Sequence, residues 1–134
     1  MNYDHFINQV HARAHLGSTE KAVTAIRATL QTLAERILPT EAADIAAQLP
    51  REIAYYLIEP QTAPERFSVG EFLKRVALRE NCDLDDATFH ARCVIEVLEE
   101  AISPGELRDL LAELPEDFDP LFTAGSRGKI RFTD

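Results

Sequence analysis

The sequence predicts an all-α protein of two homologous helical units, each with about three main helices and a short turn, packed as a pseudo-twofold bundle. The first observation is an internal duplication: residues 37–53, ILPTEAADIAAQLPREI, recur as residues 102–118, ISPGELRDLLAELPEDF. Seven of the seventeen positions are identical, where chance gives about one. The second is that apolar residues recur at helical spacing in both halves. The third is that capping residues and prolines mark the ends of these stretches.

The duplication divides the chain into four parts. Residues 1–58 form the first unit, 59–66 a linker with two prolines, 67–123 the second unit, and 124–134 a basic tail that we expect to be flexible. A unit of about fifty-five residues is marginal on its own, so we expect the two units to share one core.

The first helix of each unit is expected to be short and to bury one apolar face. In the second unit Ser68 and Glu71 form a capping-box pattern, in which the serine oxygen accepts a bond from a free backbone N–H and the glutamate bonds the serine N–H. In the first unit Asn2 is the expected cap and His5 replaces the glutamate. The expected apolar face consists of Phe6, Ile7 and Val10, repeated as Phe72, Leu73 and Val76.

The second helix of each unit is the longest and is expected to be central. It spans about residues 18–37 and 83–102, with Ser18 and Asp83 as N-caps. One side of each helix carries apolar residues at the spacing of a buried stripe. The stripe consists of Ile26, Leu30, Leu33 and Ile37, repeated as Ala91, Ile95, Leu98 and Ile102.

A proline opens and closes the third helix of each unit. Ser103 and Glu106 form another capping box, with Pro104 at the first helical position. The first unit has Leu38 in place of the serine, so we expect that end to be weaker. Each helix stops at Pro50 or Pro115 and is followed by a short turn.

Several motifs resemble the bacterial DUF2267 family of small all-helical proteins. They are Tyr-Asp-x-Phe at residues 3–6, Leu-Ala-Glu-Arg-Ile at 33–37 and Ala-Ala-Gln-Leu-Pro-Arg-Glu at 46–52. The second half has Phe-Leu-Lys-Arg-Val-Ala at 72–77 and Leu-Ala-Glu-Leu-Pro-Glu at 111–116. The resemblance covers roughly residues 3–122. It implies the fold, and it implies no catalytic residues because the family's function is unknown.

The composition narrows the class of partner. The net charge is −9, and residues 67–123 carry fourteen acidic and five basic residues, against eight and six in residues 1–66. Nucleic-acid binding requires clustered Lys and Arg, so we do not expect it. No apolar run approaches the about 20 residues that cross a membrane. We expect a cytoplasmic protein with reduced cysteines, in which the tail residues Arg127, Lys129 and Arg131 could dock on an anionic surface.

Two pairs of residues are candidate metal ligands. His11 and His15 stand at i and i+4, which on a helix puts both imidazoles on one face. His90 and Cys93 stand at i and i+3 and could serve a metal or redox role. The alternatives are two surface histidines near a helix end and a buried, structurally packed thiol.

Two arginines recur beside the central stripes. Arg27 and Arg92 are expected to form structural ion pairs with repeated acids of the third helix, either Asp44 and Asp109 or the capping-box glutamates. Binding of an anionic ligand is the alternative. Glu35 and Glu100 also recur, and we expect them on solvated helix faces.

The sequence has no recognised catalytic motif. The leading hypothesis is a non-enzymatic interaction or scaffold module whose acidic second unit binds a basic partner protein, without a cofactor. Matching outer surfaces of the two units also favour a homodimer. The alternative is a metal- or small-molecule-binding enzyme or sensor with a site between the units, formed by His11, His15, His90 and Cys93.

Overall fold

A computed structural model describes residues 1–60, 63–123 and 125–126. Every regular element in these ranges is a helix, which confirms the all-α prediction. The elements are α1 (Tyr3–Arg13), α2 (Thr19–Arg36), α3 (Pro39–Ala46), α4 (Arg51–Ile58), α5 (Val69–Glu80), α6 (Leu84–Ala101), α7 (Pro104–Ala112), the 3-10 turn η1 (Glu116–Phe118) and α8 (Asp119–Thr123). Within the same ranges, no helix combines the length and the apolar character needed to cross a membrane. The predicted tail, apart from Gly125 and Ser126, lies outside the described residues.

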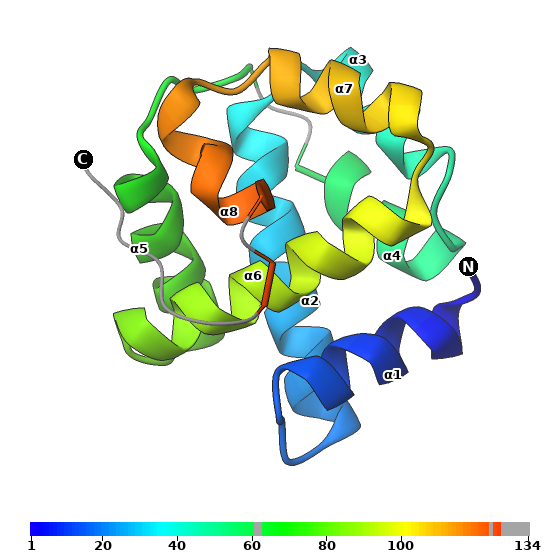
Figure 1. Cartoon of the computed structure of the whole chain (residues 1–134), viewed down its shortest axis with the longest axis vertical. Helices are drawn as coiled ribbons and strands as arrows, with labels where there is room; N and C mark the ends of the chain where they lie inside the picture. The colour runs from blue at the N-terminus through cyan, green and yellow to red at the C-terminus, as the bar shows by residue number, and fades with distance from the viewer. Residues whose placement is uncertain (61–62, 124, 127–134) are drawn as a thin grey trace.

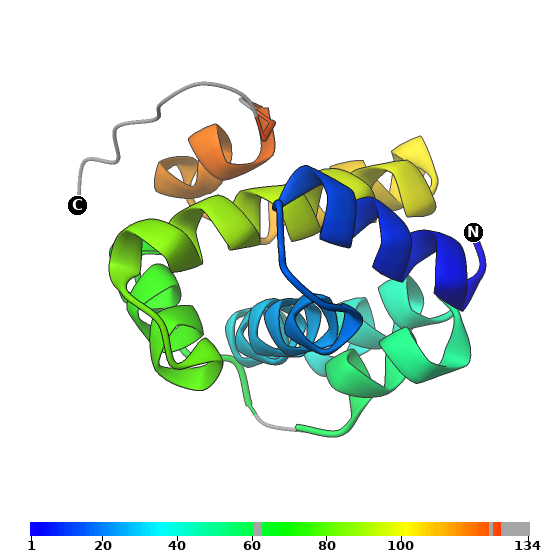
Figure 2. The ribbon, with the colours of Figure 1, turned by 90° about the horizontal axis from the view of Figure 1, so that it is seen from below.

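The two longest helices, α2 and α6, cross at the centre of the molecule (Figure 1). Seen along α2, α6 passes across it, with α5 on one side and α1 and α4 on the other (Figure 2). Helix α5 contacts both α2 and α6, and α1 contacts the same two helices. Helices α3 and α7 meet at one end of the molecule (Figure 1). Helices from both halves therefore surround one shared core.

The predicted apolar stripes form the centre of this core. All eight stripe residues are buried, from Ile26, Leu30 and Ile95, which are fully inaccessible, to Ile102, which is 7% exposed. Phe72 of α5 packs edge-on against Phe118 of η1, with ring centroids 5.6 Å apart. This burial confirms the stripe prediction. Apolar residues that repeat about every 3.6 positions lie along one side of a helix, and that side faces the core.

The serine and aspartate caps form as predicted, but the glutamates do not complete the capping boxes. Ser103 Oγ accepts a bond from the Glu106 N–H at 3.2 Å, and Ser68 Oγ accepts one from the Glu71 N–H at 3.2 Å. The N–H of Ser103 instead donates to the side-chain oxygen of Gln48 at 2.6 Å. Glu71 Oε2 accepts a bond from Arg75 Nε. The glutamates are thus available for other contacts.

The short turn predicted after each third helix is longer in the structure. After Pro50 the chain forms α4, an eight-residue α-helix that buries Ile53, Ala54 and Leu57. After Pro115 it forms η1 and then α8. Helix α3 was expected to stop at Pro50 but ends earlier, at Ala46. Pro50 instead serves as the N-cap of α4, a place where proline's missing N–H costs nothing.

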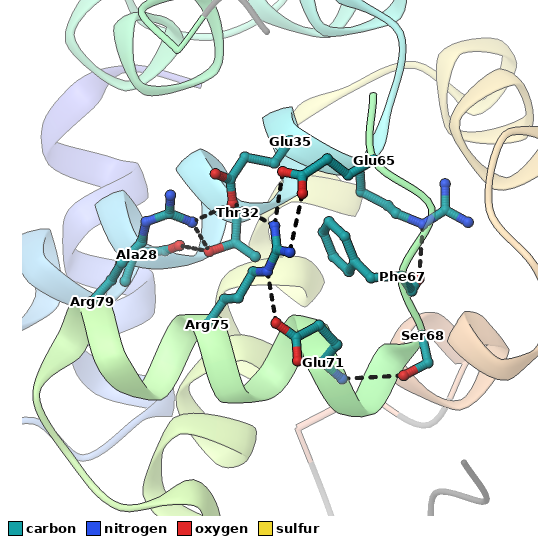
Figure 3. Close-up of polar contacts among 10 residues, drawn as sticks. Ala28, Thr32, Glu35, Glu65, Phe67, Ser68, Glu71, Arg75 and Arg79 are labelled. Atoms are coloured by element: carbon teal, nitrogen blue, oxygen red, sulfur yellow. Dashed lines mark hydrogen bonds and ion pairs between the residues drawn. The ribbon is translucent and has the colours of Figure 1, made fainter. Parts of the chain in front are cut away.

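A polar network fixes α5 against α2 (Figure 3). Arg75 forms two bonds to the carboxylate of Glu65, at 3.0 and 3.2 Å, and lies 3.4 Å from Glu35. Arg79 donates to the buried hydroxyl of Thr32 at 2.6 Å and to Glu35 at 2.8 Å. Glu35 therefore takes part in ion pairs between the halves, and the prediction of a solvated face was wrong.

A similar ion pair joins α1 to α6. Arg13 forms two bonds to the carboxylate of Glu100, at 2.7 and 2.8 Å, and a third to Glu96 at 2.8 Å. Each half thus places an arginine near the end of its first helix against a glutamate of the other half's long helix.

We predict that Arg79→Met lowers the free energy of unfolding by about 1–2 kcal/mol, because the Thr32 oxygen and Glu35 each lose a hydrogen-bond donor. Urea denaturation measures the change. Arg27→Met is the matched control, since Arg27 is an exposed arginine of the neighbouring helix whose side chain has no ion pair in the described ranges. It should change stability by less than about 0.5 kcal/mol.

The loss of unfolding free energy in Arg79→Met should depend on pH. The hydrogen bond from Arg79, with the charges of Arg79 and Arg75, holds the pKa of Glu35 below its ordinary value despite partial burial. A carboxylate with a lowered folded-state pKa stabilises the fold above its unfolded pKa, and this contribution is lost as pH falls through the folded pKa. The effect of Arg79→Met should be full at pH 7 and shrink below about pH 4. If the difference in unfolding free energy between Arg79→Met and the unchanged protein stayed constant down to pH 3, the effect would come from packing and not from the ion pair.

Candidate metal centre

The turn between α5 and α6 gathers polar side chains in a small space. Helix α5 ends at Glu80, and Asn81 follows with φ 57°, a left-handed conformation that asparagine adopts more easily than most residues. Asp83 then caps α6 through the N–H of Asp86 at 2.8 Å. The chain therefore reverses within three residues. The reversal brings Cys82 and the end of α5 next to His90 of α6.

Glu80, Cys82 and His90 each direct a metal-ligating atom into this space. One carboxylate oxygen, the thiol sulfur and one imidazole nitrogen all lie within 4.8 Å of one another. The Glu80 side chain is only 7% exposed, and its Oε2 contacts Nδ1 of His90. Its other oxygen, Oε1, is buried and has no hydrogen-bond partner among the described residues. An unpaired buried carboxylate oxygen is costly, so this oxygen marks a position for a cation or donor.

The protonation of the cluster follows from the same contacts. The contact with Glu80 raises the pKa of His90 above its ordinary value, against partial burial. Burial, followed by the charge of Glu80, raises the pKa of the Cys82 thiol to about 12. Without a metal, the site therefore favours protons on the imidazole and the thiol. A metal cation would take the place of these protons.

A pocket of about 450 Å³ opens beside the cluster, between the two halves of the chain. The second half contributes Glu80, Cys82 and His90 to its lining, and the first half contributes His15 and Lys21. One side of the cluster thus faces a space large enough for water or a small ligand.

The structure does not place His11 and His15 on one helical face. Helix α1 ends at Arg13, and His15 has φ 52°, beyond the helix. His15 stacks on Phe89 with ring centroids 6.2 Å apart and borders the pocket beside His90. His11 belongs to no cluster of potential ligands within the described ranges. Of this pair, only His15 therefore approaches the candidate centre.

His90 and Cys93 likewise separate. His90 joins Glu80 and Cys82, whereas Cys93 is fully buried in the core. Burial raises the pKa of the Cys93 thiol to about 12. Cys93 thus has the surroundings of a packed thiol, which was the structural alternative considered from the sequence.

The predicted ion-pair residues lie apart from this centre. Arg27 is exposed on α2, and its expected pair with Asp44 is not formed within the residues described. Arg92 is buried, and its Nε donates to the carbonyl of Gly125 at 2.8 Å. A pair between Arg92 and Asp109, which is exposed on α7, stays a prediction.

The sequence matches a model of a known protein family. A family model described as "Uncharacterized conserved protein (DUF2267)" matches residues 3–121. The chain belongs to the DUF2267 family. This confirms the resemblance drawn from the sequence motifs. No curated protein matches the chain, so the DUF2267 assignment brings no activity with it.

Sequence reasoning on this DUF2267 chain missed two of the three clustered residues. Glu80 was not singled out, and Cys82 was considered only as a reduced thiol. The available signal was Glu-x-Cys at the junction of two helices, followed two helical turns later by His90. Its meaning depends on how sharply the chain turns at Asn81, which propensities alone do not fix.

We predict that the two thiols of this DUF2267 protein differ in reactivity with a disulfide reagent. Cys82 is half-buried and should react slowly at neutral pH, because its raised pKa leaves little thiolate. Cys93 should react only after unfolding. Thiol counting on the native and the urea-unfolded protein tests this, with Cys82→Ser as the control that should leave no accessible native thiol. Rapid native labelling in that variant would contradict it.

Proposed function

We propose that the protein binds one transition-metal ion of the Zn²⁺ class through Glu80, Cys82 and His90, and acts as a metal-responsive binding module. The observation that carries the proposal is the buried Glu80 carboxylate, whose Oε1 lacks a partner among the described residues while a thiol and an imidazole lie within 4.8 Å. The pocket beside them leaves room for a fourth ligand.

The ligand types favour a borderline metal. Sulfur and imidazole nitrogen are preferred by Zn²⁺ and its neighbours, whereas Mg²⁺ and Ca²⁺ prefer oxygen. Ligand atoms around a tetrahedral Zn²⁺ stand about 3.5 Å apart, so small side-chain rotations bring the three groups into range. A Glu80–His90 ion pair alone satisfies Oε2 and leaves Oε1 unpaired. A metal ion compensates the carboxylate and the thiolate together.

A second candidate function is docking of a basic partner protein beside the metal centre. Leu78 is 81% exposed and Leu84 46% exposed, and both line a mostly apolar groove that also contains Lys74 and Cys82. Asp83 and Asp85 are exposed next to Leu84. This combination of apolar and acidic groups fits an amphipathic basic segment, whose charges complement the acidic second half. Because Cys82 borders both features, metal binding would alter the groove.

We also propose that the two halves are copies of one unit related by a pseudo-twofold axis. The ion pairs Arg13–Glu100 and Arg79–Glu35 support this, because they join corresponding positions in opposite directions. The helix contacts support it in the same way, since α1 packs on α6 as α5 packs on α2.

The metal proposal predicts that the protein, after chelator treatment, takes up one Co²⁺ or Zn²⁺ per chain. Co²⁺ should produce a thiolate-to-metal charge-transfer absorption, which identifies Cys82 as a ligand, and Zn²⁺ should displace it. Cys82→Ser or His90→Ala should weaken binding by more than about 100-fold, since outer-shell changes alone cost 10–100-fold.

Two variants serve as controls for metal binding. Cys93→Ala removes the buried thiol and His11→Ala removes a histidine outside the cluster, and both should retain the charge-transfer band. Circular dichroism verifies that each variant is folded. If Co²⁺ bound without the band, or if Cys82→Ser bound it as tightly as the unchanged protein, the proposed centre would be wrong.

The docking proposal predicts that a basic amphipathic peptide binds more weakly as salt rises from about 50 to about 500 mM. Fluorescence anisotropy measures the affinity. Leu78→Lys should abolish binding, whereas Tyr55→Lys, a substitution at another exposed apolar residue, should not. Salt-independent binding contradicts the proposal. Sedimentation distinguishes a further outcome, in which Leu78→Lys disrupts a dimer and the occupant of the groove is a second copy of the chain.

A further inference from the structure

Helices α3 and α7 lie side by side at one end of the molecule, and they run antiparallel (Figure 1). The first turn of each helix carries a glutamate three residues after its cap, Glu41 in α3 and Glu106 in α7. In a capping box such a glutamate bonds the backbone N–H of its own cap residue. Here neither cap N–H is available to its own glutamate.

Each cap N–H instead bonds a side chain from the other half of the chain. The N–H of Leu38 donates to Oε1 of Glu113 at 2.9 Å, and the N–H of Ser103 donates to Oε1 of Gln48 at 2.6 Å. A side chain just beyond the end of each helix thus accepts a bond from the cap N–H at the start of the other helix. This arrangement leaves the carboxylates of Glu41 and Glu106 without the role that their position would normally give them.

Glu41 is nearly fully buried, at 6% exposure. Its Oε1 is buried without a hydrogen-bond partner in the part of the chain that the structure describes, and so is Oε2 of Glu106. Asp109, one turn further along α7, adds a third carboxylate. One oxygen from each of the three groups lies within 4.8 Å of the other two.

No cation among the described residues balances this cluster. The described ion pairs include none of the three carboxylates. Burial, followed by a side-chain hydrogen bond with Glu106 and then by the negative charges of Glu106, Glu113 and Asp109, raises the pKa of Glu41 to about 8. Like charges this close are unfavourable unless a proton or a cation lies between them.

We propose that Glu41, Glu106 and Asp109 bind one hard divalent cation, of the Ca²⁺ or Mg²⁺ class, that joins α3 to α7. The ligands are all carboxylate oxygens, the donors that such cations prefer, and water completes the coordination. Neighbouring oxygens around Ca²⁺ lie about 3.4 Å apart, so rotation of the exposed Asp109 side chain closes the site. This site differs from the thiol-containing centre in ligand chemistry and in position, and neither depends on the other.

The test is titration of the full chain with Ca²⁺ and with Mg²⁺ after chelator treatment, in the Cys82→Ser background that disables the other centre. Isothermal titration calorimetry measures affinity and stoichiometry, and thermal denaturation reports stabilisation. We expect one ion per chain and a rise in Tm. Glu41→Gln and Asp109→Asn should each weaken binding by at least about tenfold. Asp44→Asn is the matched control, because Asp44 occupies the corresponding place in α3, outside the cluster, and it should leave binding unchanged.

Two results would overturn the proposal. The first is the absence of stoichiometric binding, together with a Glu41→Gln variant that is more stable than the unchanged chain; the two glutamates would then share a proton. The second is binding that Glu41→Gln and Asp109→Asn leave intact. Circular dichroism establishes that both variants are folded, and the exposed position of Asp109 keeps the test decisive if Glu41→Gln fails to fold.

Discussion

The burial of α2 and α6 against each other is the constraint on which the rest of the structure depends. Each helix has one apolar stripe, and no single neighbour covers it. Helices from both halves complete the cover, since α1 and α5 each contact both long helices. The polar groups at the edges of this core must then be satisfied across the halves, as Arg79 does for the buried hydroxyl of Thr32. Neither half has a complete core by itself.

The sequence predicted the elements better than the contacts between them. The central stripes and the caps at Ser18, Ser68, Asp83 and Ser103 follow from local spacing and side-chain chemistry, and all of them form. The helix after Pro50 was underestimated, because proline marks a helix end and a helix start with the same residue. Glu35 was misjudged because the arginines that pair with it lie 40 or more positions away in the sequence. Such pairings depend on the tertiary arrangement.

The candidate sites were harder to predict for the same reason. The expected His11 and His15 pair assumed a continuous helix, whereas α1 ends at Arg13. Glu80, Cys82 and His90 meet because the chain turns sharply at Asn81, and Glu41 meets Glu106 because α3 and α7 pack side by side. The two clusters also differ in kind: one combines sulfur, nitrogen and oxygen, and the other contains oxygen alone. Their metal preferences should therefore differ, although both lie in one small protein.

Because the caps of α3 and α7 bond side chains from the opposite half, neither half can form its third helix fully when the chain is cut between the halves. The N–H of each cap residue, Leu38 or Ser103, is bonded by a side chain from the other half, Glu113 or Gln48. A fragment cut between the halves would lose core contacts and also the group that starts its third helix. Helix initiation is the costly step in helix formation, so this segment would fray first in an isolated half. An isolated half could regain such a bond only from a second chain that associates with it.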